Sequence, residues 1–528
     1  MADNEQELHQ EGWSPVGSPG IIAVAVMLST FMEVLDSTVV NVSLPHIAGN
    51  LSASIDESTW VLTSYLVSNA IVLPATGWFS MLFGRKRFYM FCVAAFVVSS
   101  VMCGLAPTLP LLVFFRVLQG LGGGALQPIA QAILLESFPL HKRGMGMAIF
   151  GIGVVFAPII GPTLGGWITD NYSWRWIFYI NLPVGILSLI MTQIFVVDPP
   201  YLRRGVTKID YTGLGLLALG IGALQIVLDN GERNDWFQTS WIVQMSIISV
   251  VALIALVLWE RHTEHPIIDL SILRVRNFAP GVTLIFTLGI ALYGSMVLLP
   301  VFMQNLLGYS ATQSGLAMSP GGVGTLICMP IVGYLVGRRD ARYLTVIGLV
   351  TLSFSMFMMS RYNLQIGFWE VVIPRVVMGV GLAFLFVPLS TVSFAFMPRS
   401  QMGTGTGIFN LMRNIGGSVG IAWVTTTLAR RAQFHQARLV EHVSIYNPIS
   451  VQHMKQLMNA LIVGGQTYWN AQAEALGLTY STVLRQASAM SFIDCFWMLG
   501  VAMIVLLPII FIMRRPPRQQ GPPPGGMH

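Results

Sequence analysis

The sequence predicts an all-α polytopic membrane protein with about fourteen transmembrane helices, built as two six-helix bundles and two inserted helices. Composition is the first observation behind this class: 54% of the 528 residues are hydrophobic and 10% are charged, whereas an ordinary soluble protein is about 25% charged. The second is the recurrence of apolar runs of about 20 residues, the length that crosses a bilayer. The third is an internal repeat of motifs at a fixed spacing.

The apolar runs define the predicted spans. They lie at residues 21–45, 59–81, 88–107, 110–134, 144–166, 176–197, 211–229, 239–259, 278–300, 313–336, 343–360, 368–391, 404–428 and 492–513. Basic residues gather in alternate loops, as in the run 85–87, while the loops on the other side hold little beyond Arg175, Arg233 and Arg361. Because short cytoplasmic loops carry the excess of Lys and Arg, both termini are predicted to be cytoplasmic. The net charge of +6 has the same origin, so it predicts no nucleic-acid partner.

The repeat gives the domain organisation. A set of residues in spans four and five recurs 259 positions later, as Arg116 does at Arg375: Val117, Gly120, Gly122, Pro139, Gly144, Gly146, Ile149, Phe150 and Gly161 match Val376, Gly379, Gly381, Pro398, Gly403, Gly405, Ile408, Phe409 and Gly420. Two bundles in the same orientation, related by a pseudo-two-fold axis along the membrane normal, follow from this register. Helices inserted between them must be even in number, and the two spans within 211–259 fulfil this condition.

The predicted parts can therefore be named along the chain. They are a cytoplasmic N-terminal tail (1–20), an N-terminal bundle (21–197), cytoplasmic linkers with the two inserted helices (198–277), a C-terminal bundle (278–513) that includes a periplasmic loop (429–490), and a disordered cytoplasmic tail (514–528). The first tail is acidic and lacks the basic region of a signal peptide, so the first span should be retained. In the periplasmic loop, residues 451–461 have an amphipathic helical pattern.

Two carboxylates interrupt the first span. Glu33 and Asp36 are three residues apart and share one helix face, which must therefore look at protein or water. A carboxylate at the centre of a membrane helix costs roughly 2.5–3.5 kcal/mol, so such a residue is a functional-site hypothesis by default. Burial disfavours the charged form of a carboxylate and a nearby cation favours it, so small rearrangements can move a proton on or off the group.

Four motifs carry a family resemblance. They are the first-span run Leu35-Asp36-Ser37-Thr38-Val39-Val40-Asn41-Val42, the fourth-span Arg116 to Gly122, the fifth-span Gly153, Pro158, Gly161, Pro162, Gly165 and Gly166, and the loop residues Gly77, Gly84, Arg85 and Lys86. With these residues the chain resembles the major facilitator superfamily, and within it the fourteen-span drug:proton antiporters of the EmrB-like kind. The resemblance implies a proton-driven multidrug exporter of the bacterial inner membrane that works by alternating access. It also implies a periplasmic membrane-fusion adaptor and an outer-membrane channel as partners.

One position departs from the family pattern. The loop after the second span has Met81 where the superfamily motif usually has Asp. If that Asp pairs with a basic group to latch the outward-facing state, this chain must hold that state in another way.

Roles for the intramembrane residues follow from the resemblance and from depth. At 1.5 Å per residue, Asp36 and Arg116 come to similar depths and could pair or share water. Asp36 is predicted to carry the exchanged proton, the alternative being a purely structural ion pair. Glu33 is either a second proton site or a cation-binding group. Arg116, which stays charged, would stabilise the charged form of the carboxylate and relay the conformational change. The residues predicted to line a substrate cavity are Asn41, Gln119, Gln127, Asn410, Arg413 and Asn414.

The sequence also predicts absences. It holds no nucleotide-binding loop, metal-ligand cluster or nucleophile triad, so no enzyme activity and no cofactor are expected, and the proton gradient should supply the energy. The four cysteines fall in or beside apolar runs, which argues against a disulfide framework. Two other functions remain open: a dedicated exporter of one metabolite, such as a siderophore or a fatty acid, and a non-transporting membrane sensor.

Overall fold

The computed structural model describes residues 17–139, 142–199, 210–263 and 266–515, and the regular elements in these ranges are all helices. Twelve helices or helix pairs are long and apolar enough to cross a membrane, and the bent helix α8 is a thirteenth. The remaining predicted span, 404–428, lies within the long helix α17. All fourteen predicted spans are thus helical. The predicted tail 514–528 and the first sixteen residues lie almost wholly outside the described part.

The helices follow in chain order. The first half contains α2 (Pro19–Asn50), the short α3 (Ile55–Ser58), α4 (Trp60–Phe83), α5 (Arg85–Leu105), α6 (Leu109–Gly123), α7 (Leu126–Ser137), α8 (Arg143–Asn171), α9 (Trp176–Tyr179) and α10 (Asn181–Phe195). The inserted pair is α11 (Tyr211–Asn230) and α12 (Ser240–Glu260), joined by the 3-10 turns η2 (Glu232–Asn234) and η3 (Trp236–Gln238). After η4 (Leu270–Arg274), the second half contains α13 (Phe278–Asn305), α14 (Ala311–Val336), α15 (Ala341–Met359), α16 (Phe368–Ser393), η5 (Arg399–Gln401), α17 (Met402–Val440), α18 (Pro448–Val463), α19 (Tyr468–Val505) and α20 (Leu507–Ile512).

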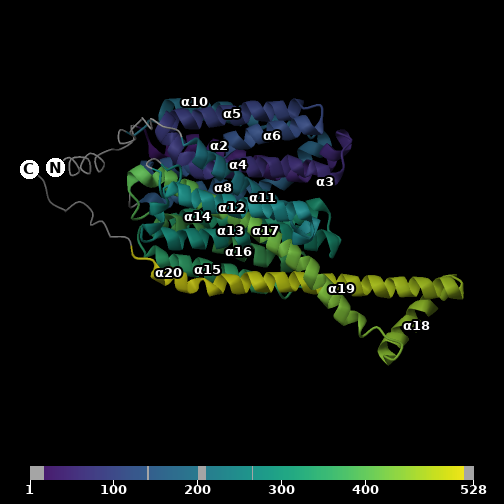
Figure 1. Ribbon diagram of the computed structural model, residues 1–528. Coiled ribbons are helices and arrows are strands. Elements are labelled where there is room, and N and C mark those ends of the chain that lie inside the picture. The colour runs from purple at the N-terminus through teal and green to yellow at the C-terminus, as the bar shows by residue number, and fades with distance from the viewer. Residues whose placement is uncertain (1–16, 140–141, 200–209, 264–265, 516–528) are drawn as a thin grey trace, which may run out of the picture.

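The bundle has two distinct ends. Figure 1 shows α20 at one end, which we call the terminal end, and α18 beyond the other, which we call the hairpin end. The helices α17 and α19 both continue past their predicted spans, so residues 429–440 and 468–490 of the predicted periplasmic loop are helical extensions. The amphipathic segment 451–461 forms part of α18.

An ion cluster holds the two extensions together at their base. Asp494 Oδ2 of α19 accepts from Arg431 Nε at 2.6 Å and from His435 Nε2 at 2.7 Å, both on α17. A surface position is the simplest expectation for His435, but its side chain is buried against this aspartate. We call residues 429–490, which include α18, the hairpin. These contacts hold the hairpin in place as an extension of the bundle.

The two halves touch through glycine backbones. A Cβ on Gly77 of α4 would lie 2.5 Å from the backbone N of Thr404 in α17, and one on Gly144 of α8 would lie 2.7 Å from the carbonyl oxygen of Gly333 in α14. Because a side chain at either position would collide with backbone, the halves can pack this closely only with glycine there. Both contacts lie toward the terminal end.

The fifth-span motif packs inside the first half. A Cβ on Gly165 of α8 would lie 3.0 Å from Val39 Cα in α2, and one on Gly161 would meet the Thr38 side chain. The helix contains Pro158 and Pro162, and its parts 143–158 and 160–171 meet at 41°, as expected when proline removes helical hydrogen bonds. The motif thus packs α8 closely against the helix that carries Glu33 and Asp36.

Candidate functional site

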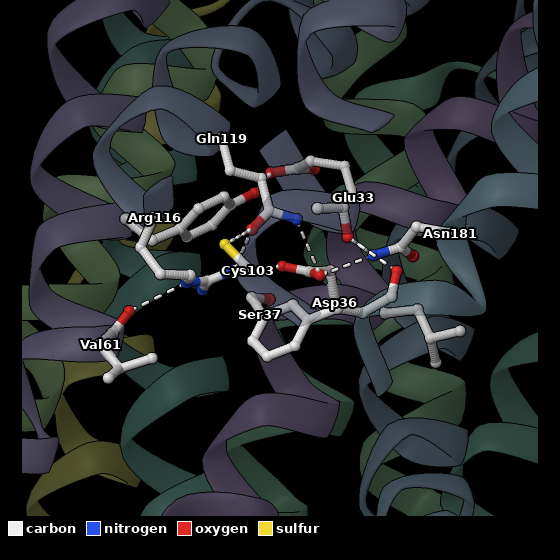
Figure 2. A network of polar contacts seen from close by, with 12 residues as sticks. Glu33, Asp36, Ser37, Val61, Cys103, Arg116, Gln119 and Asn181 are labelled. Atoms are coloured by element: carbon white, nitrogen blue, oxygen red, sulfur yellow. Dashed lines mark hydrogen bonds and ion pairs between the residues drawn. The ribbon is translucent and has the colours of Figure 1, made fainter. Parts of the chain in front are cut away.

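Asp36 and Arg116 form a buried ion pair in the first half (Figure 2). Arg116 Nη1, on α6, donates to Asp36 Oδ2 on α2 at 2.6 Å, and both side chains are 0% exposed. Arg116 Nε also donates to the Val61 carbonyl oxygen at 2.9 Å. The guanidinium carbon lies 4.1 Å from the centre of the Tyr65 ring, a cation–π distance. The arginine is therefore held on several sides.

The remaining oxygen of Asp36 is also occupied. Its Oδ1 accepts from Gln119 Nε2 at 3.0 Å and from Asn181 Nδ2 at 2.7 Å. Gln119 Oε1 in turn accepts from Arg116 Nη1 at 2.8 Å, and Asn181 reaches Ser100 Oγ at 2.9 Å. Figure 2 shows these donors converging on the carboxylate. Both oxygens of Asp36 are thus hydrogen-bonded to three donor residues, one of them a cation, and the network ties α2 to α6 and α10.

Glu33 has a different environment. Its Oε1 accepts from Tyr65 Oη and Asn69 Nδ2, both at 3.1 Å, and its Oε2 accepts from Gln127 Nε2 at 2.5 Å. Its side chain is buried, and within the described ranges no Lys, Arg or His forms an ion pair with it. All its hydrogen-bond donors are neutral. Glu33 therefore differs from Asp36 in having no cationic hydrogen-bond donor within the described part of the chain.

A hydrogen-bonded chain leads from Glu33 into the second half. Gln127 Oε1, on α7, accepts from Arg413 Nη2 on α17. One turn further along the same helices, Asn410 Nδ2 donates to Gln131 Oε1 at 2.6 Å. Arg413 is buried, and its Nε and Nη1 make no hydrogen bond with the part of the chain that the structure describes. Gln127 thus joins an acid of one half to a cation of the other.

The predicted cavity residues fall into two groups. Gln119, Gln127, Asn410 and Arg413 are buried and take part in the contacts above. Asn41 is exposed and Asn414 is half-buried, and neither side chain is hydrogen-bonded to another described residue. The structure therefore does not bring Asn41 and Asn414 into the network.

Sequence reasoning missed several members of the network. Tyr65 and Asn69 are four residues apart on α4, so both face Glu33. The polar spacing that drew attention to Glu33 and Asp36 is present there as well. Asn181 and Gln131 stand alone in apolar surroundings, and only the tertiary contacts reveal their partners.

Arg375 does not reproduce the environment of its repeat counterpart Arg116. It is buried, and its Nη1 contacts Met378 Sδ at 2.9 Å. Within the described ranges it forms no ion pair, and its Nε has no hydrogen-bond partner. The two halves therefore share a backbone plan but not an acid–base pair.

The loop motif is stabilised by acids from outside the motif. Arg85 Nη1 pairs with Glu136 Oε2 of α7 at 2.5 Å, and both side chains are buried. The backbone N of Lys86, at the start of α5, donates to Asp198 Oδ1 at 2.7 Å, and its Nζ reaches the Gln193 carbonyl oxygen at 2.7 Å. Gly84 has φ +85°, a conformation that favours glycine. Glu136 and Asp198 thus supply carboxylates next to the loop in which Met81 replaces the usual Asp.

The described residues contain no disulfide and no candidate metal site. All four cysteines lie within the described ranges as free thiols. No group of three or more His, Cys, Asp or Glu side chains in those ranges could hold a metal ion.

The sequence profile of the Major Facilitator Superfamily matches residues 26–421. The chain belongs to the major facilitator superfamily. Solved facilitator structures share its fold: the proton:xylose symporter XylE superposes with a TM-score of 0.57 at 15% identity, covering 93% of this chain and 95% of that one. The resemblance given by the sequence motifs is confirmed at this level.

Curated facilitators are similar over nearly the whole chain. The multidrug export protein EmrB of Haemophilus influenzae is 37% identical over 502 residues, which cover 94% of this chain and 96% of the relative. The fatty acid resistance protein FarB of Neisseria gonorrhoeae is 36% identical over 513 residues, covering 96% and 97%. The similarity therefore extends through both halves and the inserted helices.

Proposed function

We propose that this facilitator is a proton-coupled multidrug exporter of hydrophobic and amphipathic compounds that works by alternating access. The similarity to multidrug export proteins supports the export function. The observation that carries the coupling is the chain of contacts from Glu33 through Gln127 to Arg413, because it connects a protonatable group in one half to a charge in the other. No cofactor is needed, since the proton gradient supplies the energy.

The exchanged proton is assigned to Glu33. Protonation would remove the negative charge that Gln127 Nε2 faces, and a hydrogen bond to a neutral acid is weaker than one to a carboxylate. Gln127 would then hold Arg413 less firmly, and the halves could separate at α7 and α17. Release of the proton would restore the contact and draw the halves together. The charge of one carboxyl group thereby biases the conformational equilibrium.

Asp36 serves as an anchor in this scheme. Its carboxylate is saturated by Arg116, Gln119 and Asn181, so giving it a proton would break several bonds at once. The expectation that Asp36 itself carries the exchanged proton stays a prediction, and comparing Asp36→Asn with Glu33→Gln tests it. Arg116 pairs with Asp36 and holds α6 against α2.

The decisive experiment uses the full chain in proteoliposomes with an imposed pH gradient. Glu33→Gln should abolish the proton movement caused by a hydrophobic dye such as ethidium, while dye exchange without a gradient continues. Glu57→Gln is the matched control, because Glu57 is exposed at the end of α3. Full proton coupling in Glu33→Gln would overturn the assignment. Absence of any dye flux in the parent chain would favour a sensor.

A second candidate is a dedicated exporter of fatty acids. It is favoured by the 36% identity to the fatty acid resistance protein FarB. Competition assays decide between the two: a multidrug exporter should move several unrelated dyes, whereas a dedicated exporter should move only the fatty acid. Fatty-acid inhibition of dye flux would show that both classes share one site.

We place the protein in the inner membrane with its terminal end in the cytoplasm. The hairpin would then lie in the periplasm, where we assign it to partner docking. Its tip exposes large apolar side chains, with Tyr446 and Val463 each 89% exposed and Trp469 76% exposed. Such a patch on a projecting element suits a protein partner, here a periplasmic membrane-fusion adaptor leading to an outer-membrane channel. Replacing residues 441–467 with a short linker should abolish drug resistance in cells and leave flux in proteoliposomes intact. Loss of both activities would show that the hairpin serves the bundle itself.

A further inference from the structure

The inserted helix α11 contacts both halves of the transporter. A Cβ on Gly222 would lie 3.5 Å from the side chains of Val67 and Ile71 in α4 of the first half. Gln225 Nε2, one turn further along α11, donates to Ser418 Oγ of α17 at 2.6 Å. Trp236 Nε1, just beyond α11, donates to Thr426 Oγ1 of α17 at 2.9 Å. The inserted pair is therefore attached to the two elements that move relative to each other during alternating access.

A carboxyl group lies at this junction. Asp229 Oδ1, in the last turn of α11, accepts from Gln225 Nε2 at 3.1 Å. Its Oδ2 is buried and accepts no hydrogen bond from the part of the chain that the structure describes. The Thr63 hydroxyl of α4 lies within hydrogen-bonding reach of the carboxyl group, and Arg233 of η2 is the nearby positive charge. No ion pair of Asp229 occurs within the described ranges.

Gln225 is placed to act as a tether. Its side chain is buried, and the single amide nitrogen donates both to Asp229 and to Ser418. A bond from this amide to an ionised carboxylate is charge-assisted and fixes the direction of the amide. The same fixed amide then reaches the second half at Ser418. The charge on Asp229 thus decides how firmly α11 is held to α17.

We propose that Asp229 is a second proton-binding group, located on the inserted helices, that switches α11 between the two halves. This inference rests on the proposed proton-coupled function. In the ionised state, Asp229 orients Gln225 toward Ser418, and α11 follows the second half. In the protonated state, the added hydrogen on Oδ2 can be donated to Thr63, the bond to Gln225 weakens, and α11 follows the first half. The proton enters from water at the hairpin end and returns to water.

Chemistry favours this reading over a purely structural acid. A buried carboxylate oxygen without a donor is costly while it is charged, whereas a protonated carboxyl group can use the same oxygen as a donor. A structural acid would be expected to have both oxygens satisfied, as Asp36 has. Asp229 has an amide donor on one side and, on the other, the Thr63 hydroxyl, which can donate to a carboxylate or accept from a carboxylic acid.

The test reads protonation directly and needs no substrate. Infrared difference spectra of the purified full chain, recorded between acidic and alkaline buffer, should contain a carboxylic-acid C=O band that Asp229→Asn removes and Asp229→Glu restores at a shifted frequency. Asp235→Asn, in the exposed turn after η2, is the matched control and should leave the band unchanged. An identical spectrum in Asp229→Asn would overturn the proposal.

A distance measurement tests the switch. Spin labels at positions 235 and 430, both exposed, should move apart at acidic pH in the parent chain and show no pH dependence in Asp229→Asn. Ser418→Ala should remove the movement while the infrared band remains. If Glu33→Gln abolishes proton coupling and Asp229→Asn changes neither spectrum nor distance, the proposed function stands and this inference fails. If the Asp229 band is present but dye flux is not, the proposed function fails instead.

Discussion

Asp36 and Arg116 form an ion pair at 2.6 Å in which both side chains are fully buried. Removing one member of such a pair leaves an uncompensated buried charge, which costs about 3–5 kcal/mol. We expect Asp36→Asn to lower the free energy of unfolding by about this amount. The loss should be seen as a lower melting temperature in detergent. If Asp36→Asn instead keeps the parental stability and loses proton coupling, Asp36 is the proton carrier.

The pair offers its own control. Replacing both partners with apolar residues removes the buried charges together, and such replacements are often neutral or stabilising. The double variant Asp36→Leu, Arg116→Met should therefore be more stable than either single variant. The stability lost in the double variant could instead equal the sum of the losses in the two single variants. That result would mean that the loss comes mainly from Gln119 and Asn181, which are left without an acceptor.

Gln127 should be required for coupling but not for proton binding. Gln127→Met keeps the length of the side chain and removes both bonds, so Glu33 could still exchange protons while Arg413 no longer responds. We expect dye flux that no longer depends on the pH gradient, measured as the ratio of proton to dye movement in proteoliposomes. Gln131→Met removes the neighbouring bond to Asn410 and a long contact to Met147 Sδ but leaves the bonds of Gln127 in place, so it should keep that ratio near the parental value.

The glycine contact between α8 and α14 should control the resting conformation. Gly144→Ala would place a methyl group 2.7 Å from the Gly333 carbonyl oxygen, and overpacking of this kind costs about 1–3 kcal/mol. The state closed at the terminal end should become less populated, with longer spin-label distances between positions 87 and 339. Gly166→Ala, whose nearest neighbour would be Val42 at 3.9 Å, should not change them.

Glu136 should supply the carboxylate contact that this loop lacks at Met81. Glu136→Gln removes the charged partner of buried Arg85. We expect the same spin-label distances, between positions 87 and 339, to lengthen and the thermal stability to fall. Exposed Asp170→Asn, at the opposite end of α8, should leave both readouts unchanged.

The helical framework could be predicted because each span has its own hydropathy signal. All fourteen predicted spans lie on helices, and α11 and α12 provide the even number of inserted helices that the repeat requires. The extents of α17 and α19 were not predicted, because their polar extensions have no bilayer signal and owe their packing to contacts such as Asp494 with Arg431.

The acids and the arginine of the site were also found from the sequence, since charges within apolar runs are conspicuous. Their partners were not. Whether Asp36 or Glu33 faces Arg116 depends on helix rotation. The spacing of Tyr65 and Asn69 places them on one face of α4, but Glu33 is identified as their partner only once α4 is placed against α2. Met81 identified a missing carboxylate, but only the fold shows Glu136 and Asp198 near the same loop.

The continuity of α17 has a mechanical consequence. The helix begins at the terminal end, passes Arg413 at the centre and continues without a break to Val440, so about 40 Å of rigid rod extends beyond Arg413 at 1.5 Å per residue. A small tilt of the second half about the centre is amplified along this lever. A protein bound at the far end of α17 would be displaced each time the second half tilts, so each transport cycle would move the bound partner.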